Sequence, residues 1–250
     1  MSYTYFSQYY DKLMSEDFDY EKIADYIENV FDMFDCRADI VCELACGTGN
    51  ITLPLARRGY DMIAIDRSFQ MLDIARKKAA EQGADNILFL NQNMTRLDLY
   101  GSANAFICMI DGINYILNPN SLFNMFKKIR RCFIEPDGLI LFDISTEYKL
   151  KNKLGNNTFI YNGDDMFYSW ENRYLENKKI SDMYLNFFAK QKNGLYRRFA
   201  ERHLQRAYNK TEILEMLRKA GFEKTEVFDG FSFAPCKDSS ERAVFAARIK

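Results

Sequence analysis

The chain has 250 residues, of which 48% are hydrophobic and 28% are charged, a composition typical of globular proteins. Its 34 basic and 35 acidic residues give a formal net charge of -1, which argues against a nucleic-acid partner because phosphate binding normally needs a basic excess. The length allows one large α/β domain, or a core domain with a small subdomain, and would make two full domains cramped.

The cysteines, the single histidine and the lack of long apolar runs exclude further classes of protein. The six cysteines contain no Cys-x-x-Cys pair and the chain has one histidine, so we expect no metal site. We find no run of about 18 apolar residues and no basic segment followed by an apolar one, so we expect no membrane partner. These features together predict a reduced protein of the cytoplasm.

Helical periodicity governs the first part of the chain. Residues 11–34 carry apolar side chains at helical spacing, so we expect a helix that begins near Asp19 or Tyr20. The segment before it is expected to form an ordered arm or a short helix. Residues 1–36 together make the predicted N-terminal unit, a helical arm.

From Asp39 onward, apolar strands alternate with amphipathic helices. This alternation predicts a parallel, doubly wound α/β sheet, which we assign to residues 37–145 and 207–250. The expected elements are strand 39–44, helix 50–58, strand 61–65, helix 68–82 with a Ser68 cap, strand 87–90, strand 104–110, helix 120–133, strand 138–144, helix 210–220 with a Thr211 cap, strand 222–229 and strand 243–249.

After residue 145 the apolar pattern changes to a period of two, which is typical of antiparallel strands. We therefore expect residues 146–206 to form an antiparallel β subdomain whose edge over the main sheet acts as a lid. The alternating segments are 164–176, 180–191 and 195–208.

The expected turn between the last two of these strands fixes their register. Asn193-Gly194 is a strong signal for a two-residue hairpin turn. Such a turn would place Tyr184 opposite His203, with Glu201 on the same polar face.

The stretch VCELACGTGN at residues 41–50 has the pattern of a strand that turns tightly into a ligand-binding helix. Gly47 and Gly49 allow the backbone to approach a ligand closely. The third glycine of a dinucleotide fingerprint would fall at Thr52, which argues against NAD. Glu43 suits a cationic amino-acid group, because its carboxylate would repel a pyrophosphate.

Asp66 ends the second strand, where it can accept hydrogen bonds from both ribose hydroxyls of an adenosine. NAD and S-adenosylmethionine share this role, so the cofactor stays open at this point. After the third strand, Asn93 could bond the adenine amino group or simply cap a loop, and Met94 could cover the ring. These residues and Met109 lie at the carboxyl edge of the sheet, where open α/β sheets bind ligands.

Five segments form an ordered set of motifs: ELACGTGN at 43–50, Asp66, QNM at 92–94, CMIDGINYI at 108–116 and IEPDGLILFD at 134–143. Together they resemble the class I S-adenosylmethionine-dependent methyltransferases. Within that class, FSQYYDKLM and DYEKIADYI near the N-terminus and RHLQRAYNKTEILEMLRKAGF at 202–222 resemble the small-molecule N-methyltransferases of the amino-sugar and glycine type. They also resemble a related bacterial group of unassigned substrate.

The resemblance implies a Rossmann-like, seven-stranded sheet with the order 3-2-1-4-5-7-6 and an antiparallel last strand. It also implies S-adenosylmethionine as the cofactor, with Tyr10 and Tyr20 closing over its methionine end and backbone contacts from Ala45 and Met109. Asn93 departs from the family, in which this position usually holds Asp. The residues expected to bind the cofactor are Tyr10, Tyr20, Glu43, Ala45, Gly47, Gly49, Asp66, Arg67, Met71, Asn93, Met94 and Met109.

The candidate catalytic residues on the acceptor side are Asp111, Tyr115 and His203. An acceptor amine must be neutral and a hydroxyl needs a base, so titratable groups at the carboxyl edge are of interest. Asp111 either contacts the acceptor or caps a helix, Asp143 either reaches the acceptor or bonds loop amides, and His203 is an acceptor residue or a structural histidine. In the amino-sugar enzymes a histidine takes the place of Tyr115, so that base is not available here.

The predicted function is transfer of a methyl group from S-adenosylmethionine to a small-molecule acceptor at nitrogen. Three alternatives stay open: a nicotinamide-dependent oxidoreductase, a non-catalytic S-adenosylmethionine-binding protein with a protein partner, and a methyltransferase that acts on RNA or protein. The sequence leaves the identity of the acceptor and the oligomeric state undetermined.

Overall fold

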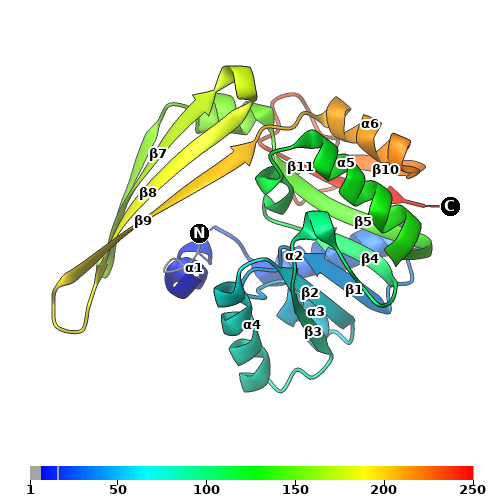
Figure 1. Cartoon of the computed structure of the whole chain (residues 1–250), viewed down its shortest axis with the longest axis horizontal. Helices are drawn as coiled ribbons and strands as arrows, with labels where there is room; N and C mark the ends of the chain where they lie inside the picture. The colour runs from blue at the N-terminus through cyan, green and yellow to red at the C-terminus, as the bar shows by residue number, and fades with distance from the viewer. Residues whose placement is uncertain (1–6, 16, 250) are drawn as a thin grey trace.

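The computed structural model describes residues 7–15 and 17–249, so the first six residues of the predicted N-terminal unit lie outside the described part. Two β-sheets form the framework, one of seven strands and one of four. Figure 1 shows the larger sheet with its covering helices on one side of the molecule and the smaller, elongated sheet on the other.

The larger sheet contains the strands β1 (Ile40–Leu44), β2 (Asp61–Asp66), β3 (Ile87–Asn91), β4 (Ala103–Cys108), β5 (Ile134–Ser145), β10 (Lys224–Asp229) and β11 (Arg242–Arg248). Their order across the sheet is β10-β11-β5-β4-β1-β2-β3. The pairs among β1 to β5 are parallel, whereas β11 is antiparallel to both β5 and β10. The predicted order 3-2-1-4-5-7-6 with an antiparallel last strand is confirmed, because β10 and β11 are the sixth and seventh strands of this sheet.

The α-helices are α1 (Ser7–Met14), α2 (Tyr20–Met33), α3 (Thr52–Arg57), α4 (Phe69–Glu81), α5 (Pro119–Lys128) and α6 (Lys210–Ala220). Short helical turns are η1 (Met94–Arg96), η2 (Gly112–Tyr115), η3 (Ile129–Phe133), η4 (Lys149–Lys153) and η5 (Glu176–Lys178). Among the described residues, no helix is both long and apolar enough to span a membrane.

Two helix ends differ from the sequence prediction. The helix expected over 120–133 ends as α5 at Lys128 and continues as the π-helical turn η3. The cap of α6 is Asn209 rather than Thr211, because the Asn209 side chain accepts a hydrogen bond of 2.8 Å from the backbone N–H of Glu212.

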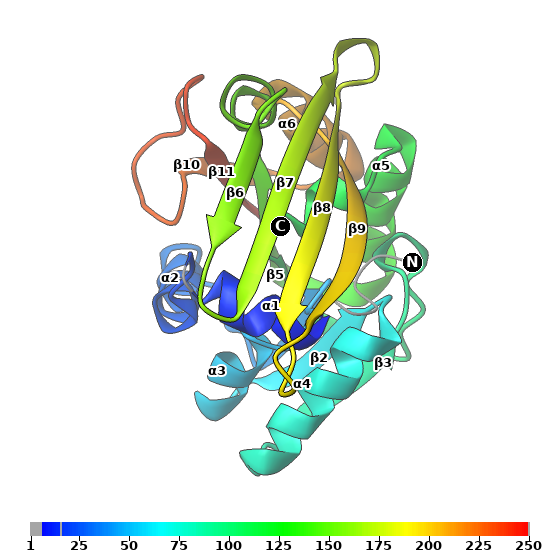
Figure 2. The same cartoon turned by 90° about the vertical axis from the view of Figure 1, so that its left-hand side faces the viewer.

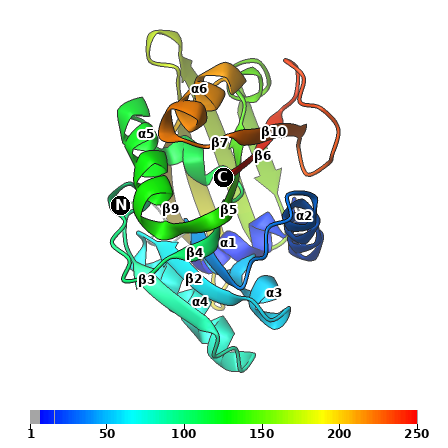
Figure 3. The ribbon, with the colours of Figure 1, turned by 90° about the vertical axis from the view of Figure 1, so that its right-hand side faces the viewer.

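Helices cover both faces of the large sheet, as Figure 3 shows. Phe126 of α5 and Leu217 of α6 join Phe142 of β5 in a buried cluster on one face. On the other face, Val30 of α2 packs in a cluster that contains Leu141 of β5 and residues of α3. Neighbouring residues of β5 thus alternate between two apolar clusters, which confirms the doubly wound arrangement.

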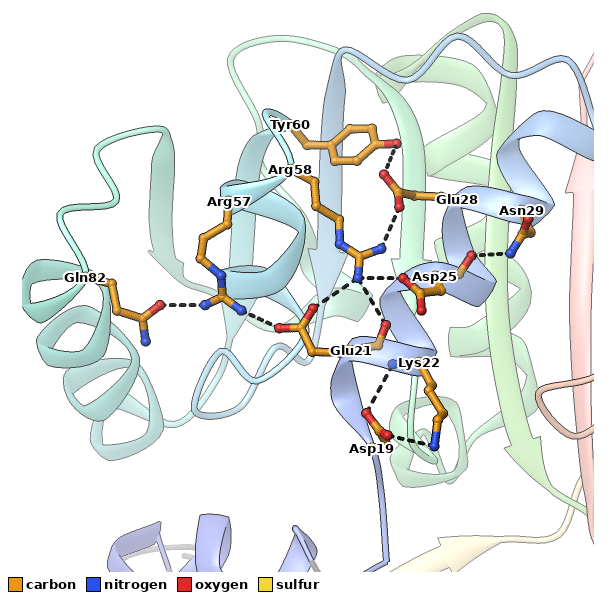
Figure 4. Close-up of polar contacts among 10 residues, drawn as sticks. All are labelled: Asp19, Glu21, Lys22, Asp25, Glu28, Asn29, Arg57, Arg58, Tyr60 and Gln82. Atoms are coloured by element: carbon orange, nitrogen blue, oxygen red, sulfur yellow. Dashed lines mark hydrogen bonds and ion pairs between the residues drawn. The ribbon is translucent and has the colours of Figure 1, made fainter.

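A network of charged side chains ties α2 to the end of α3 (Figure 4). The guanidinium group of Arg58 contacts the carboxylates of Glu21, Asp25 and Glu28 at nitrogen–oxygen distances of 3.0, 2.7 and 2.5 Å. The hydroxyl of Tyr60 also donates a hydrogen bond of 3.1 Å to Glu28. The network holds α2 against the helix that follows the glycine turn.

The smaller sheet contains β6 (Thr158–Asn162), β7 (Met166–Leu175), β8 (Ile180–Lys190) and β9 (Tyr196–Arg206), paired antiparallel in chain order. Figure 2 shows this sheet in front of the larger one. The antiparallel insertion is therefore confirmed, although β6 was not expected because its five residues are too few to establish a periodic pattern. The insertion starts and ends side by side, since Thr146 and Tyr208 form an isolated parallel bridge.

The register predicted for the last hairpin is wrong by one residue. Lys190 pairs with Tyr196, and the backbone N–H of Gln191 donates a hydrogen bond of 2.7 Å to the carbonyl of Leu195. Three residues, 192–194, therefore form the turn in place of the predicted two, with Gly194 at a φ of 81°. Tyr184 consequently pairs with Arg202, and His203 pairs with Met183. Because side chains alternate along a strand, the shift places the side chains of Tyr184 and His203 on opposite faces of the sheet.

Candidate functional site

A cavity of about 340 Å³ lies at the carboxyl ends of β1, β2 and β4, the edge at which the sequence predicts ligand binding. The predicted site residues that line it are Tyr10, Ala45, Gly47, Asp66, Arg67, Met71, Asn93, Met94 and Tyr115. The predicted residues outside its lining are Tyr20, Glu43, Gly49, Met109, Asp111 and His203.

Half of the residues that line the cavity were not among the site residues predicted from the sequence. The additional residues are Ser68, Gln92, Thr95, Ile110, Gly112, Ile116, Leu117, Asn118 and Ser121. They belong to the loops that follow β2, β3 and β4, or to the start of α5. Membership of these loops was a signal available in the sequence, because loops at the carboxyl edge of a parallel sheet surround the ligand.

The two glycines of the turn have different roles. Gly47 lines the cavity at a φ of 56°, and a Cβ atom added there would meet nothing within 4 Å. At Gly49, with a φ of 78°, an added Cβ would lie 3.2 Å from the Cβ of Ala75 in α4. Gly47 therefore leaves its backbone accessible to a ligand, whereas Gly49 allows α4 to pack against the turn.

Asp66 holds the glycine turn in place. Its carboxylate accepts a hydrogen bond of 2.9 Å from the backbone N–H of Gly47 and one of 2.7 Å from that of Ser68. Burial raises the pKa of Asp66, and these two hydrogen bonds oppose that shift. The side chain is thus fixed at the end of β2 and borders the cavity, which is the position required of a ribose-binding acid.

Glu43 is buried below the turn and does not reach the cavity lining. Its side chain is 3% exposed and accepts a hydrogen bond from the hydroxyl of Thr52, the first residue of α3. Burial, reinforced by the nearby charge of Asp66, raises the pKa of Glu43 to about 8. In the structure Glu43 therefore positions the start of α3, and its contact with a ligand ammonium group stays a prediction.

Asn93 caps the turn η1 at the edge of the cavity. Its side-chain oxygen accepts hydrogen bonds of 2.9 Å from both the backbone N–H and the hydroxyl of Thr95. The capping interpretation of Asn93 is confirmed, and its contact with an adenine ring stays a prediction. Met94 follows it in the lining.

In the loop after β4, Ile110 lines the cavity in place of Met109, which the sequence predicted. Met109 is 4% exposed and packs in the apolar cluster beneath α2, while Ile110 lines the cavity with a φ of 58°. A Cβ atom on Gly112 would lie 2.6 Å from the sulfur of Cys108, so only glycine fits at that point of the loop. The predicted contact of Met109 through its backbone stays a prediction.

Asp111 is held in a partly buried ion pair and is not among the residues that line the cavity. It accepts hydrogen bonds of 2.8 Å from Arg242 and 2.9 Å from the hydroxyl of Ser145. Although burial opposes ionisation, the charges of Arg242 and Lys149 lower the pKa of Asp111. An ionised, paired carboxylate is a weak base, and Asp111 makes no side-chain cap on η2. Its contact with an acceptor stays a prediction.

Asp143 shares the same arginine. It is fully buried at the end of β5, pairs with Arg242 and accepts a hydrogen bond of 3.3 Å from the backbone N–H of Asp111. This is the loop-amide role that the sequence offered as one of two interpretations. Arg242, which the sequence analysis did not name, compensates both carboxylates.

Asn114 fastens the smaller sheet to the cavity loop, and the sequence analysis did not identify it. Its fully buried side chain donates hydrogen bonds of 2.9 Å to the carbonyls of Ser145 and Arg206 and accepts one of 2.9 Å from the N–H of Ser145. Three elements, η2, β5 and β9, therefore meet at one amide. Nothing in the local sequence indicates these partners.

The N-terminal helix α1 lies over the glycine turn. Tyr10 lines the cavity, and the carboxylate of Asp11 accepts hydrogen bonds from Thr48, from Asn50 at 2.9 Å and from Lys78 at 2.9 Å. Tyr20, at the start of α2, lies outside the lining, and burial raises its pKa to about 12. The closing role predicted for these two tyrosines stays a prediction.

Tyr115 connects the cavity with the smaller sheet. It lines the cavity, and its hydroxyl lies 3.2 Å from Nδ1 of His203 in β9. His203 is 5% exposed, and burial followed by the charge of Arg67 lowers its pKa to about 4. The structure thus brings two of the three candidate catalytic residues into contact, with Tyr115 between the imidazole and the cavity.

Comparison with known proteins identifies the family. A family model described as a methyltransferase domain matches residues 41–138. A protein of Geobacillus sp. (strain WCH70), provisionally named a methyltransferase, is 30% identical over 249 residues, which cover 99% of this chain and 100% of that protein. The crystal structure of an S-adenosylmethionine-dependent methyltransferase from Clostridium acetobutylicum ATCC 824 matches with a TM-score of 0.90 and 32% identity over 99% of this chain and 98% of that one. The chain belongs to the S-adenosylmethionine-dependent methyltransferases.

A more distant structure shows the same fold. This methyltransferase matches CalS10 from Micromonospora echinaspora, an amino pentose methyltransferase, with a TM-score of 0.76 and 14% identity over 100% of both chains. The CalS10 structure contains bound S-adenosylmethionine. Family membership identifies the cofactor of this methyltransferase as S-adenosylmethionine and overturns the nicotinamide alternative.

The residues present fit this cofactor. The cavity volume lies within the range of about 300–1,000 Å³ common for small-ligand sites. An immobilised carboxylate, Asp66, borders it at the end of β2, and Gly47 offers a backbone without a side chain next to it. Asp66 would hold the ribose, Gly47 and Ala45 the amino-acid end, and Asn93 and Met94 the adenine.

Proposed function

We propose that this methyltransferase acts on a small molecule and transfers the methyl group to a nitrogen atom. One observation supports the small acceptor: the antiparallel sheet reaches the end of the cavity, where Tyr115 contacts His203 of β9. We therefore expect an acceptor beside Tyr115 to lie next to this sheet, which restricts its size. A nucleotide within a folded RNA would need a more open approach.

The chemistry divides between cofactor and protein. When bound, S-adenosylmethionine supplies a methyl group that an acceptor lone pair can take while the C–S electron pair remains on sulfur. The protein then has to hold the acceptor in line with that bond and to exclude water. Tyr10 and Tyr115 are the polar side chains placed to orient an acceptor at the cavity, and the antiparallel sheet with α1 limits access of water.

Nitrogen is the proposed acceptor atom for two reasons. An amine in its neutral form attacks without a general base, and the two candidate bases, Asp111 and His203, are weak ones, since Asp111 is paired with Arg242 and burial lowers the pKa of His203. The second reason is the fold shared with CalS10, whose acceptor is an amino pentose.

Cofactor binding is the first test. Calorimetry is expected to show binding of S-adenosylmethionine and S-adenosylhomocysteine, weakened about 10- to 100-fold in Asp66→Ala, because a charged hydrogen-bond acceptor is worth about 1.5–3 kcal/mol. Asp73→Asn is the matched control, since Asp73 pairs with Lys77 on α4 away from the cavity, and it should change affinity less than twofold. Absence of binding, or equal affinity in Asp66→Ala, would refute the site.

Acceptor class is the second test. Methyl transfer is measured with a panel of amino sugars and amino acids, with bulk tRNA, and with unfractionated protein as acceptors. We expect transfer to members of the amine panel. Transfer to tRNA with a steep salt dependence would contradict the proposal, as would tight cofactor binding without turnover on any of the three acceptor classes.

A further inference from the structure

The contact between Tyr115 and His203 joins the loop after β4, at the lining of the cavity, to the smaller sheet. Tyr115 is the last residue of η2, and His203 lies in β9, which runs toward the large sheet (Figure 1). The two rings are 6.0 Å apart and nearly perpendicular, and the Tyr115 hydroxyl lies 3.2 Å from Nδ1. Tyr115 lines the cavity and His203 does not, so any effect of the imidazole on an acceptor passes through the phenol.

The ionisation state of the imidazole restricts the direction of this hydrogen bond. Burial and the charge of Arg67 lower the pKa of His203 to about 4, so the ring is neutral near pH 7. A neutral imidazole has one nitrogen that donates and one that accepts. If Nδ1 accepts, the Tyr115 hydroxyl donates to it, and the phenol oxygen presents only acceptor positions to the cavity.

An oxygen that only accepts recognises a group that donates. A primary or secondary amine next to the transferred methyl group has an N–H that can donate to the phenol oxygen. When that N–H is held in this way, the nitrogen lone pair points in another direction and can face the methyl group. Tyr10, whose high pKa reflects burial and the proximity of Tyr20, Tyr115 and Asp111, lies at the same end of the cavity. The charged neighbour of the imidazole on the cavity side is Arg67, and Glu201 shares its face of β9 two residues away.

We infer that His203 is a positioning residue that orients the Tyr115 hydroxyl, so that the phenol oxygen accepts a hydrogen bond from the N–H of a primary or secondary amine acceptor. This inference rests on the proposed function and narrows its substrate class to amines that retain an N–H. It differs from a direct base role for His203, because the imidazole stays neutral and away from the acceptor.

The direction of the hydrogen bond can be measured without cofactor or acceptor. His203 is the one histidine of the chain, so nitrogen-15 labelling of histidine gives the signals of a single imidazole. Near pH 7 we expect the proton on Nε2 and a hydrogen-bonded, unprotonated Nδ1, whose signal shifts in Tyr115→Phe. Tyr184→Phe is the matched control, because Tyr184 lies on the opposite face of the sheet and should leave the spectrum unchanged.

Two spectroscopic results would overturn the inference. One is a proton on Nδ1, which would make the imidazole the donor and turn the Tyr115 hydroxyl toward the cavity as a donor. The other is an imidazole spectrum that Tyr115→Phe does not change. Both results are independent of methyl transfer, so they are distinguishable from failure of the proposed function, which would appear as absent cofactor binding.

Kinetics test the positioning role. His203→Leu should lower kcat/KM for a methylated amine of the panel about tenfold, the effect of one orienting hydrogen bond, with the affinity for S-adenosylmethionine within twofold of the wild type. His203→Asn keeps an amide near the position of Nδ1 and should restore part of the loss. Met183→Leu, a change in the cross-strand neighbour of His203, is the packing control and should retain full activity.

A separate comparison of methyl-transfer rates tests whether the acceptor must retain an N–H. Primary amines of the panel are compared with their N,N-dimethyl forms, which lack an N–H. We expect the N–H forms to be preferred at least about tenfold by the wild type and the preference to be lost in Tyr115→Phe. Equal rates for both forms, or a preference that persists in Tyr115→Phe, would overturn the inference.

Discussion

Glu43 provides a quantitative test of how the cofactor turn is built. The carboxyl group lies at the end of β1, 3% exposed, with the hydroxyl of Thr52 as its hydrogen-bond donor and the charge of Asp66 nearby. Glu43→Gln keeps the size of the side chain and an oxygen that can accept from Thr52, but it cannot ionise. The substitution therefore isolates the cost of placing a charge at this site.

The effect of Glu43 on the free energy of unfolding, in sign and in magnitude, follows from its pKa, which rises from 4.5 to about 8 on folding. Because the folded state binds the proton more tightly than the unfolded state, stability is lost as the pH rises from about 4.5 to about 8. At about 1.4 kcal/mol for each pKa unit, the protein is about 3 kcal/mol less stable at pH 7 without its cofactor, because Glu43 ionises in the unfolded state while the folded state still holds the proton. Below the unfolded-state pKa the penalty is absent.

Urea denaturation of the wild type and of Glu43→Gln at several pH values measures this penalty. The difference in free energy of unfolding should move by about 3 kcal/mol in favour of Glu43→Gln between about pH 5 and pH 8, because all other titrating groups cancel in the difference. Parallel pH profiles for the wild type and Glu43→Gln would refute the reasoning.

Two further predictions concern the contacts that close the site. Asn114→Ala should lower the free energy of unfolding in urea by about 2–4 kcal/mol, because it leaves the N–H and the carbonyl of Ser145 and the partly buried carbonyl of Arg206 without this partner. A loss below about 1 kcal/mol would contradict this role. Asp11→Ala should weaken the affinity for S-adenosylmethionine about tenfold in calorimetry by releasing α1 from Lys78 and the glycine turn. Its free energy of unfolding should change by less than about 1 kcal/mol, since the ion pair is partly exposed, and unchanged affinity would rule out a closing role for α1.

Much of the fold could be predicted because its signals are local. Alternating apolar strands and amphipathic helices indicate a doubly wound sheet, and strand ends at Asp66 and Asn93 lie at one edge whenever such a sheet is parallel. The antiparallel insertion was likewise readable from its period of two. The resemblance to methyltransferases added the strand order, which periodicity alone does not determine.

The sequence predictions were wrong for the hairpin register and for the cap of α6, because in each case a shift of one or two residues changes the structure. An Asn-Gly pair occurs in hairpin loops of different lengths, and the longer loop around Gly194 shifts every pair of β8 and β9 by one. That shift separates Tyr184 from His203. The cap of α6 was misplaced for a similar reason, since Asn209 and Thr211 are both good capping residues two positions apart.

Other interactions connect residues too far apart in the chain for local patterns. Asp111 was expected to contact the acceptor or cap a helix, but its carboxylate pairs with Arg242, 131 residues away. Asn114 reaches the carbonyl of Arg206 over 92 residues. In both cases the partner is a single side chain or backbone group brought close by the order of the strands, and neither has a sequence pattern of its own.

The amino-acid sequence by itself determined the methyl donor, because the residues predicted to bind the cofactor lie in short contiguous segments at the ends of parallel strands. Topology places those segments together without further information. Only the tertiary structure decided how the acceptor side is arranged, because it depends on how the antiparallel sheet docks on the loop after β4. Tyr115 and His203 are 88 residues apart in the chain, and their contact exists through that docking alone.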